Sequence, residues 1–539
     1  MGKRAITYFA FFLWLLFGTI VFSQQREFIT GRLLDATTNE PIVFASIRIK
    51  DQALGVISNV DGSFKIPIKY KAYGDILEIS SMGYQSKEFL IQEMSENTLH
   101  ILKLEPAVFG LSETIVTAKK KKTKLSARQI VRKAIAAIPQ NYPTDPFSTI
   151  GYYRDYQFNE NKYVNLNEAI LEVFDYGFDE PDYKTTQVKI FDYIENKDFE
   201  ADNGARQQYN YQTSQKVIDN AYLSGYGGNE FVILRVHDAI RNSKVNSYDF
   251  ANILVIDFMK NHTFSKEPIT FLNDEALYVI RFNALKPGYR VHGTMYISKR
   301  DFSIHKMEYA LYNNRKLNKS QKPDKNGFDK QLIFEVTTAY ARRDNKMYLN
   351  FISFNNSFKL WQPPIFQEKY IDIDVEKGRF IVEFSQKVDK EDGKILSNYT
   401  FKFKDKKIDF EKVEVGDEKV FLYPKRKYAT QAEEVRTMFF QIDSVWKKNS
   451  TETEKIGELL VTDIKNIHDV KGNLLGEWTT NNYNQFREFF VQEVKTNTEA
   501  PLNSRFMDKK RPIFKDQPIA RQDNFDKYWM NTPLPPIKD

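Results

Sequence analysis

The sequence of 539 residues contains no cysteine and only six histidines, and it lacks the short motifs that mark many enzymes. The absence of cysteine excludes disulfide bonds, thiol nucleophiles, thiolate metal ligands and a lipid on an N-terminal cysteine. No two histidines have the i, i+4 spacing of a helical zinc site, and Gly-x-Ser-x-Gly and Gly-Lys-Ser/Thr motifs are missing. We therefore expect no enzyme, no metal and no other cofactor.

Glycine is also scarce, at 23 residues, whereas 43 phenylalanines and 30 tyrosines are present. Aromatic side chains pack well across neighbouring strands, so this composition predicts a mainly β protein. The length predicts more than one domain. The formal net charge of +7 is modest and spread along the chain, so nucleic acid is not expected as a partner.

One strongly apolar segment stands near the start of the chain. Lys3 and Arg4 precede an apolar run from Tyr8 to Phe17, and side chains of modest size stand before Gln24. This order is typical of a cleaved export signal, which we place at residues 1–23. An uncleaved membrane anchor is the alternative, although the apolar run is short for a helical span.

Residues 24–104 contain about seven short runs with strand character, separated by turn-forming residues, and predict a small β-sandwich. Within it, Asp61 and Gly62 stand where one strand must reverse into the next. Glycine can adopt the positive φ of such a turn, and aspartate can accept backbone N–H bonds. The alternative is a calcium loop, because Asn59, Asp61 and Ser63 are spaced i, i+2, i+4; no acidic residue follows closely, so the turn is favoured.

A characteristic series of residues runs through this predicted sandwich. Its members are Gly31, Leu33, Asp35, Glu40, Pro41, Ala45, Ile47, Ile49, Gly55, Ser58, Asp61, Gly62, Phe64, Ile66, Leu77, Ile79, Ser80, Gly83 and Tyr84. The series resembles the carboxypeptidase-regulatory-like domain, a seven-stranded prealbumin-like sandwich that accompanies peptidases and outer-membrane receptors without being the catalyst. The resemblance implies a binding or bracing module, and we expect its edge at Tyr84 to contact a ligand or partner.

Residues 105–123 are expected to form a linker. The segment from Leu111 to Ala118 resembles the stretch that joins this same domain to the plug of TonB-dependent receptors, but no plug follows. Instead, the residues from Lys119 to Lys122 form a block of like charge, which normally stays solvated. A contact with TonB is the lesser alternative for this segment.

Residues 124–428 predict one helix and a large antiparallel β region. Ser126 would cap a helix whose apolar face runs from Ala127 to Ile138, and such a helix usually lies across a sheet. Long alternating strands follow, among them two joined near Asp344 and Asn345.

The hairpin "GTMYISKRDFSIHKMEYAL" in this region resembles those of the periplasmic lipoprotein carrier and related half-barrels. In these proteins a curved sheet wraps a helix and shelters acyl chains. The resemblance implies a half-barrel-like sheet here. We expect its concave face, with Tyr289, Met295 and Tyr296, to be a ligand surface.

Asp372 and Asp374 are the best candidates for a pair of carboxylates, because residues two apart on a strand face the same way. Such a pair could hold a metal or serve a glycosidase. Their alternation with Ile371, Ile373 and Val375 favours a solvent face opposite a core face.

Residues 429–539 change in character. Apolar spacing predicts one helix over 430–450 and another from Tyr483 to Val494. The proline-rich tail from Pro501 is expected to run extended over a partner or over its own domain. Prolines near the end argue against a membrane-spanning barrel, whose final strand usually ends in an aromatic residue.

Three further segments, "AIAAIPQNYP", "GYYRDYQFNENKYVNLNEAILEVF" and "REFFVQEV", extend the resemblance over most of the chain. They are similar to exported proteins of two-membrane bacteria that join a carboxypeptidase-regulatory-like domain to a β-rich region. This implies the periplasm, or the periplasmic or outer face of the outer membrane, and no particular activity.

We therefore expect a non-catalytic cell-envelope binding or scaffold protein, which shelters a lipid-like ligand or braces an outer-membrane complex. An outer-membrane or periplasmic protein, a glycan or a lipid would be its partner. The alternatives are an envelope hydrolase that acts on peptide or glycan through scattered carboxylates, and a TonB-linked outer-membrane accessory or barrel.

Overall fold

The computed structural model describes most of the chain. The described ranges are 28–52, 54–107, 125–159, 162–206, 229–245, 252–273, 275–314, 331–427, 429–446, 459–521 and 527–533. The expected export signal, the TonB-like segment and the lysine block lie outside them. Within the described ranges the expected mainly β fold class is confirmed.

The N-terminal part is the β-sandwich that the sequence predicts. Its strands form a three-stranded sheet in the order β4-β1-β7 and a four-stranded sheet in the order β3-β2-β5-β6. Alternate side chains of most strands point into a shared core. The elements are β1 (Phe28–Asp35), β2 (Ser46–Ile49), β3 (Gly55–Ile57), β4 (Ser63–Pro67), α2 (Lys69–Ala72), β5 (Ile76–Ser80), β6 (Lys87–Leu90), η1 (Ile91–Glu93) and β7 (Leu99–Leu104).

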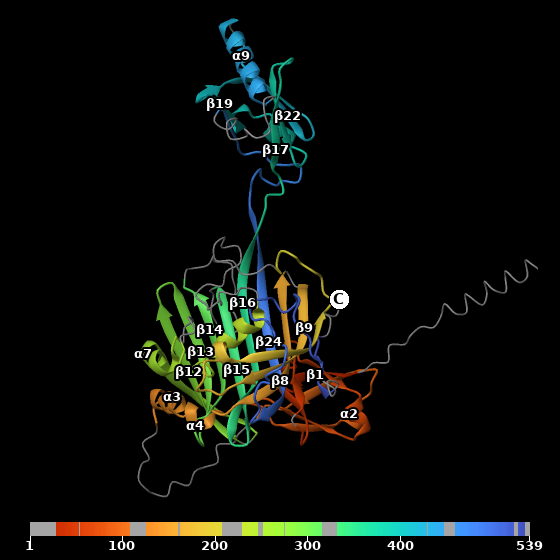
Figure 1. Ribbon diagram of the computed structural model, residues 1–539, viewed down its shortest axis with the longest axis vertical. Helices are drawn as coiled ribbons and strands as arrows, with labels where there is room; N and C mark the ends of the chain where they lie inside the picture. Colours follow the sequence, from red (N-terminus) through yellow and green to blue (C-terminus); the bar gives the residue numbers. More distant parts are fainter. Residues whose placement is uncertain are drawn as a thin grey trace, which may run out of the picture. The chain divides into compact units, whose positions relative to one another are not determined.

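The sandwich shares one compact unit with a ten-stranded sheet. The strands of this sheet lie in the order β10-β9-β8-β24-β16-β15-β14-β13-β12-β11 (Figure 1). Asp344 and Asn345 join β15 to β16 with φ of 46° and 65°, which confirms the predicted turn. The strands are β8 (Phe147–Asn159), β9 (Lys162–Asp175), β10 (Gln187–Glu195), β11 (Thr263–Leu272), β12 (Glu275–Lys286), β13 (Tyr289–Ser298), β14 (Ile304–Asn313), β15 (Leu332–Arg343), β16 (Lys346–Gln362) and β24 (Thr479–Thr496).

Strand β24 corrects the prediction of a helix from Tyr483 to Val494. It lies between β8 and β16 in the middle of the sheet. Both faces of a central strand are buried, so Phe489, Phe490 and Val491 follow one another and the two-residue alternation of a strand is lost. Adjacent apolar residues do not by themselves distinguish a strand from a helix.

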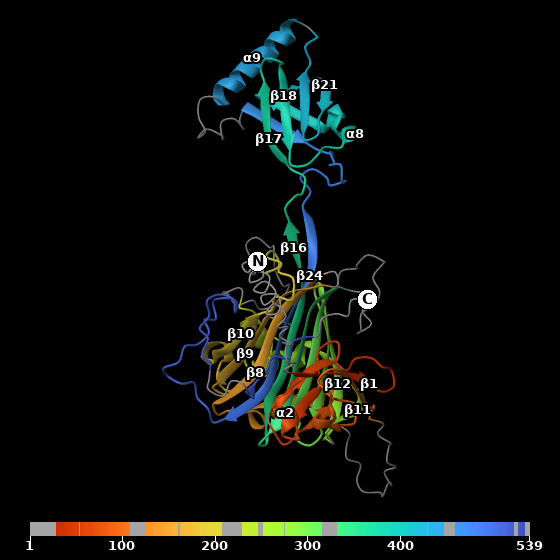
Figure 2. The same ribbon diagram turned by 90° about the vertical axis from the view of Figure 1, so that its right-hand side faces the viewer.

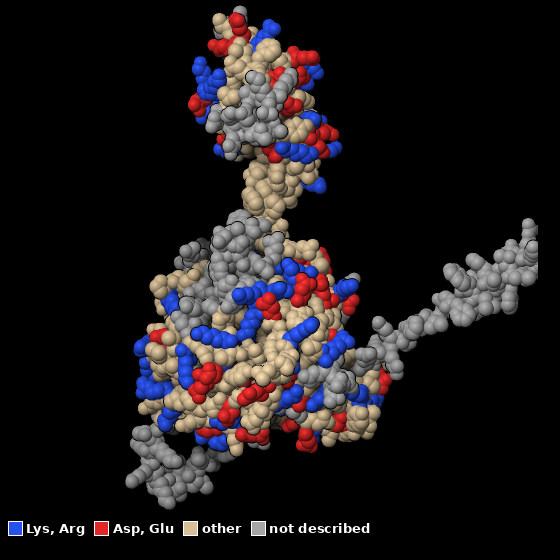
Figure 3. All heavy atoms as spheres, in the orientation of Figure 1, with Lys and Arg blue, Asp and Glu red and all other residues tan. Residues whose placement is uncertain are grey.

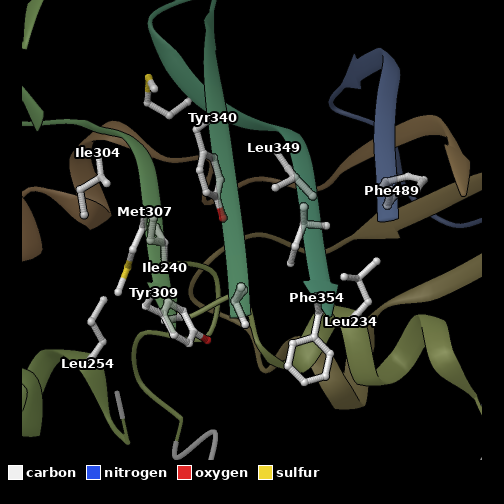
Figure 4. Close-up of a cluster of buried hydrophobic side chains, with 14 of the residues drawn as sticks. Leu234, Ile240, Leu254, Ile304, Met307, Tyr309, Tyr340, Leu349, Phe354 and Phe489 are labelled. Atoms are coloured by element: carbon white, nitrogen blue, oxygen red, sulfur yellow. The ribbon is translucent and has the colours of Figure 1, made fainter. Parts of the chain in front are cut away.

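Helices cover one face of the ten-stranded sheet, which we call the helix side (Figure 1). Helix α3 (Ala127–Ala136) begins at a capping box of Ser126 and Gln129 and packs on β11 and β13. Figure 4 shows part of the core on this side, where Met307, Tyr309 and Phe354 lie among other apolar side chains. The remaining helical elements are α4 (Ile138–Asn141), α5 (Asp182–Thr185), α6 (Glu230–Val236), the π-helix η2 (Leu254–Phe258) and α7 (Met259–Asn261).

The β-sandwich packs on the opposite face of the large sheet, which we call the sandwich side (Figure 2). The ring centroid of Phe44 lies 4.5 Å from that of Phe351, and the Phe351 centroid lies 4.9 Å from that of Phe490. Phe489 and Phe490 are neighbours on β24, and neighbouring residues of a strand point to opposite faces. Phe489 therefore belongs to the helix-side core and Phe490 to the core on the sandwich side.

Residues 359–482 form a second compact unit with its own core, whereas 1–358 and 483–539 belong to the first. The expected boundary after residue 428 differs from this division, because β24 returns to the large sheet. The helix predicted over 430–450 is confirmed as α9 (Ala429–Trp446). The other elements are β17 (Glu368–Asp374), β18 (Arg379–Phe384), α8 (Lys390–Gly393), η3 (Leu396–Asn398), β19 (Tyr399–Phe403), β20 (Lys406–Ile408), β21 (Phe410–Val415), β22 (Lys419–Pro424) and β23 (Leu460–Ile464).

The proline-rich tail runs over its own unit, which is one of the two courses expected for it. Met507 N–H donates to the Val188 carbonyl, and Ala520 N–H donates to the Ile190 carbonyl. The tail therefore covers the outer edge of β10, an edge that would otherwise present unpaired backbone groups. Among the described residues, no helix is long and apolar enough to cross a membrane.

Candidate functional site

The four residues predicted to form a ligand surface lie in two different environments. Met295 is fully buried in the helix-side core, and Tyr289 packs half-buried against the same core. Tyr296 points to the sandwich side, because side chains alternate along β13. There it lines a groove together with Tyr84 of the sandwich. The expectation of one concave face for Tyr289, Met295 and Tyr296 is therefore wrong.

The corner at Asp61 and Gly62 is the tight turn that the sequence predicts. Gly62 has a φ of 76°, and a Cβ atom there would lie 2.4 Å from the Leu33 carbonyl oxygen. Asp61 Oδ1 accepts hydrogen bonds from the N–H of Ser63 at 3.0 Å and from its hydroxyl at 2.6 Å. Over the described ranges, no group of three or more His, Asp or Glu side chains is arranged to hold a metal ion.

Next to this turn lies a buried arginine that carries no distinguishing pattern in the sequence. Arg154 of β8 is fully buried and pairs with Glu488 of β24. Its Nη1 donates to Asn59 Oδ1 at 2.6 Å and to the Asn531 carbonyl at 3.3 Å. Three segments far apart in the sequence therefore meet at one guanidinium: the sandwich, the large sheet and the C-terminal tail.

Residues 527–533 of the tail, which we call the strap, lie against both the sandwich and the sheet. Trp529 Nε1 donates to the Lys65 carbonyl at 2.8 Å. Asn531 Oδ1 accepts from the Lys65 N–H at 2.9 Å, and Asn531 Nδ2 donates to the Ile57 carbonyl at 2.9 Å. The strap thus binds the edge of β4 and fastens the sandwich to the sheet.

A largely apolar pocket of about 300 Å³, the α3 pocket, opens on the helix side. Part of its wall comes from the π-helix η2, and π-helical turns are frequent at functional sites. Val255 of η2 is 41% exposed although it is apolar, as expected at the mouth of an open pocket. The lining residues are Arg132, Ile135, Ala136, Ile138, Pro139, Phe178, Asp179, Ser243, Lys244, Val255 and Met259.

The polar groups of the α3 pocket are mainly cationic. Lys244 Nζ lies 2.6 Å from Asp179 Oδ1, so the one carboxylate of the lining is already paired with a cation. Arg132 adds an exposed positive charge beside Ile135 and Ile138. An apolar wall with a cationic edge suits a ligand with an alkyl chain and an anionic or polar head. Elsewhere, on the face that Figure 3 shows, basic and acidic side chains are interspersed.

A second and more polar hollow of about 540 Å³, the sandwich groove, lies between the sandwich and the large sheet. One wall comes from β2 and β5, and the other comes from β11 and from β13 to β16. The lining residues are Pro41, Ile42, Val43, Phe44, Ser46, Arg48, Glu78, Ser80, Ser81, Met82, Tyr84, Thr270, Leu272, Asn273, Tyr296, His305, Lys306, Ala339, Tyr340, Ala341, Asn350 and Phe351.

A histidine and a carboxylate meet at this groove. His305 Nε2 lies 3.4 Å from Glu275 Oε2, and Glu275 also accepts from the Ser298 hydroxyl at 2.5 Å and faces Arg342 at 3.5 Å. The adjacent His305 imidazole, with smaller contributions from Ser298 and Arg342, lowers the pKa of Glu275 to about 2. A carboxylate that stays ionised cannot donate a proton near neutral pH, so Glu275 is unsuited to act as a general acid.

Asp372 and Asp374 lie in the second unit and have structural surroundings. Asp372 is exposed, whereas Asp374 accepts from the Lys377 N–H at 3.0 Å and from Arg379 Nε at 3.1 Å. The apolar residues that alternate with them pack against the core of that unit. The interpretation as a solvent face opposite a core face is confirmed.

Comparisons with known proteins bear chiefly on the sandwich. No curated protein matches the chain. Among solved structures, the chain is similar to a LolA superfamily protein from Nitrosomonas europaea, with 14% identity over 43% of this chain and 86% of that chain and a TM-score of 0.20. It is also similar to a putative outer membrane lipoprotein-sorting protein domain from Vibrio parahaemolyticus, with 10% identity over 42% and 84% of the two chains and a TM-score of 0.21. Residues 29–116 match the family model of the CarboxypepD_reg-like domain, so the N-terminal sandwich of this chain is a carboxypeptidase-regulatory-like domain.

Proposed function

We propose that this protein is a non-catalytic binding protein of the cell envelope that holds a lipid-like ligand with one alkyl chain in the α3 pocket. The observation that carries the proposal is the lining of this pocket, in which Ile135, Ile138 and Phe178 form an apolar wall and Arg132 and Lys244 stand at the edge. Its volume of about 300 Å³ is at the lower end of the range of about 300–1,000 Å³ found for ligand pockets. That size favours a single chain over a lipid with several chains.

Apolar burial would supply most of the affinity. Each methylene group removed from water contributes about 0.8 kcal/mol, so a chain of several methylenes outweighs any one polar contact. The exposed Arg132 would add about 1 kcal/mol or less for an anionic head group, because solvent screens the charge. Chain length should therefore govern affinity more strongly than head-group charge.

The proposed compartment is the periplasm or the surface of the outer membrane that faces it. The positively charged start and apolar run of residues 1–23 support export, and so does the carboxypeptidase-regulatory-like domain. In this proposal the sandwich braces the large sheet, and the sheet with its helices carries the ligand.

The test is a titration of the full chain with a fluorescent long-chain fatty acid. Ala136 lines the α3 pocket and is exposed, so Ala136→Trp should obstruct the pocket without disturbing the core. The matched control is Gln140→Trp, an exposed position just past the pocket. We expect Ala136→Trp to weaken binding at least about tenfold, Arg132→Met to weaken it about two- to fivefold, and Gln140→Trp to leave it unchanged. Equal binding by all variants, or no binding by the unchanged protein, would contradict the proposal.

A further inference from the structure

We infer that helix α3, the π-helix η2 and helix α7 form a docking face for an anionic lipid bilayer, from which the α3 pocket takes up its ligand. The inference rests on the proposed function, because it names the source of the ligand that this pocket would hold. The docking face consists of Arg132 and Lys133 of α3, Val255 and Ile256 of η2, and Lys260 of α7.

The three elements lie next to one another beside the pocket (Figure 1). Helix α3 packs on η2, and the Arg128 guanidinium donates to the carbonyl of Met259, where α7 begins. Met259 lines the pocket together with Arg132 and Val255. Every other member of the docking face directly follows one of these lining residues in the chain, so the docking face borders the opening of the pocket.

The π-helix η2 exposes two aliphatic side chains. Val255 is 41% exposed and Ile256 is 51% exposed. Val255 lines the pocket but Ile256 does not, so the opening of the pocket does not account for the exposure of Ile256. The interfacial region of a bilayer would remove both side chains from water, and this transfer favours binding.

The other members of the docking face are all cations. Arg132, Lys133 and Lys260 are exposed, and none of them forms an ion pair with a carboxylate among the described residues. Helix α3 contains no acidic residue. The acid of η2, Asp257, is half-buried and accepts from the Ile253 N–H at 3.3 Å. The docking face is therefore complementary in charge to the anionic head groups of a bilayer.

This composition favours a bilayer over a protein as the partner. Protein interfaces are depleted in lysine and rich in aromatic residues, whereas the docking face has two lysines and no aromatic residue. Aliphatic side chains bordered by lysine and arginine are typical of surfaces that lie at a membrane interface. A bilayer is also a source of alkyl chains. A pocket that opens onto it can receive a chain without exposing each methylene group to water, which would be costly.

The test is flotation of the full chain with two kinds of vesicle. One contains phosphatidylcholine alone, and the other contains equal amounts of phosphatidylcholine and the anionic phosphatidylglycerol. We expect the anionic vesicles to bind at least about tenfold more tightly, and added salt to weaken this binding because it screens the attraction. Equal binding to the two kinds of vesicle, or binding to neither, would overturn the inference.

Variants assign the vesicle binding to the docking face. The double variant Lys133→Gln, Lys260→Gln should weaken binding to the anionic vesicles about tenfold, and Ile256→Ser should weaken it about fivefold. The matched control is Arg505→Gln, Lys515→Gln, which removes two exposed cations of the tail at the opposite edge of the sheet and should change nothing. Unchanged binding in the docking-face variants, or an equal loss in the control, would overturn the inference.

Fatty-acid binding is measured in the same variants. None of the residues replaced in the docking face here lines the α3 pocket, so the affinity for the fatty acid should stay unchanged. A protein that binds the fatty acid but no vesicle would overturn this inference and leave the proposed function standing. A protein that binds no fatty acid would contradict the proposed function, whatever the vesicles show.

Discussion

The two sides of the ten-stranded sheet are covered in different ways. On the helix side, one large apolar core joins the sheet to helices, and the hollow that opens there is mainly apolar. On the sandwich side, apolar rings are interleaved with buried polar groups, among them Arg154, Glu488, Asn59 and Asn531. Apolar packing tolerates small shifts, whereas a network of buried hydrogen bonds specifies one orientation of the sandwich. The polar groove depends on that orientation.

The largest effect is expected when the buried arginine on the sandwich side is removed. Arg154→Met leaves the Glu488 carboxylate buried without its cation and also loses the bonds to Asn59 and Asn531. We expect a loss of about 3–5 kcal/mol in the free energy of unfolding of the first unit, measured with chemical denaturant. The double variant Arg154→Met, Glu488→Leu should recover much of it, because no unpaired charge remains. A loss below about 1 kcal/mol in the single variant would contradict the role of this pair.

The strap offers the next largest effect. Trp529 is 4% exposed, and its indole N–H holds the edge of β4. Trp529→Ala should destabilise the first unit by about 3 kcal/mol and speed hydrogen exchange of the Lys65 amide. Trp478→Ala is the matched control, because Trp478 is 53% exposed and should contribute less than about 0.5 kcal/mol. Unchanged exchange at Lys65 would show that the strap does not hold the sandwich.

A buried carboxylate makes the helix side sensitive to pH. Asp155 accepts from the Tyr153 hydroxyl at 2.9 Å and from Asn167 Nδ2 at 2.9 Å. Burial, and then the charge of Glu230, raise its pKa from 3.8 to about 7, although Asn167, Tyr153 and Arg487 act in the opposite direction. Between pH 3.8 and about 7, the folded protein keeps a proton on Asp155 that the unfolded chain has released. The contribution of Asp155 to the free energy of unfolding therefore falls as pH rises, by up to about 1.4 kcal/mol per pH unit.

The variant Asp155→Asn should remove this pH dependence. Unfolding of the full chain is measured at several pH values between about 4 and 8. The exposed Asp372→Asn serves as the control and should keep the dependence of the unchanged protein. Parallel curves for Asp155→Asn and the unchanged protein would show that Asp155 titrates normally.

The smallest effect concerns a local feature of the helix side. Ser126 Oγ accepts from the Gln129 N–H at 3.2 Å, and Gln129 Oε1 accepts from the Ser126 N–H at 2.8 Å. Ser126→Ala should cost about 1 kcal/mol in unfolding experiments and leave the sandwich side unchanged. A much larger loss would mean that α3 positions more of the sheet than its own contacts indicate.

Local patterns in the sequence predicted the elements that depend on local physics. The turn at Gly62, the hairpin at Asp344 and Asn345, the cap at Ser126 and the sandwich strands were all correct, because each requires particular residues at short spacing. The central strand β24 was missed, since burial on both faces removes its alternation.

The hollows could be predicted only in part. Tyr84 and Tyr296 do line one groove, but the sequence gives no sign that two elements so far apart face each other. The sequence does not distinguish Arg154 from an ordinary polar residue, because its partners Asn531 and Glu488 lie far away along the chain. The α3 pocket combines helix residues with Lys244 and Val255, which become neighbours only through the fold of the sheet.

The claim that most needs testing is that the α3 pocket, and not the sandwich groove, holds the lipid-like ligand. The most direct test is one fatty-acid titration performed in parallel on Ala136→Trp, which obstructs the α3 pocket, and Ser81→Trp, which obstructs the sandwich groove. We predict that Ala136→Trp loses fatty-acid binding while Ser81→Trp retains it in full. Loss of binding in Ser81→Trp, or retention in Ala136→Trp, would contradict the claim.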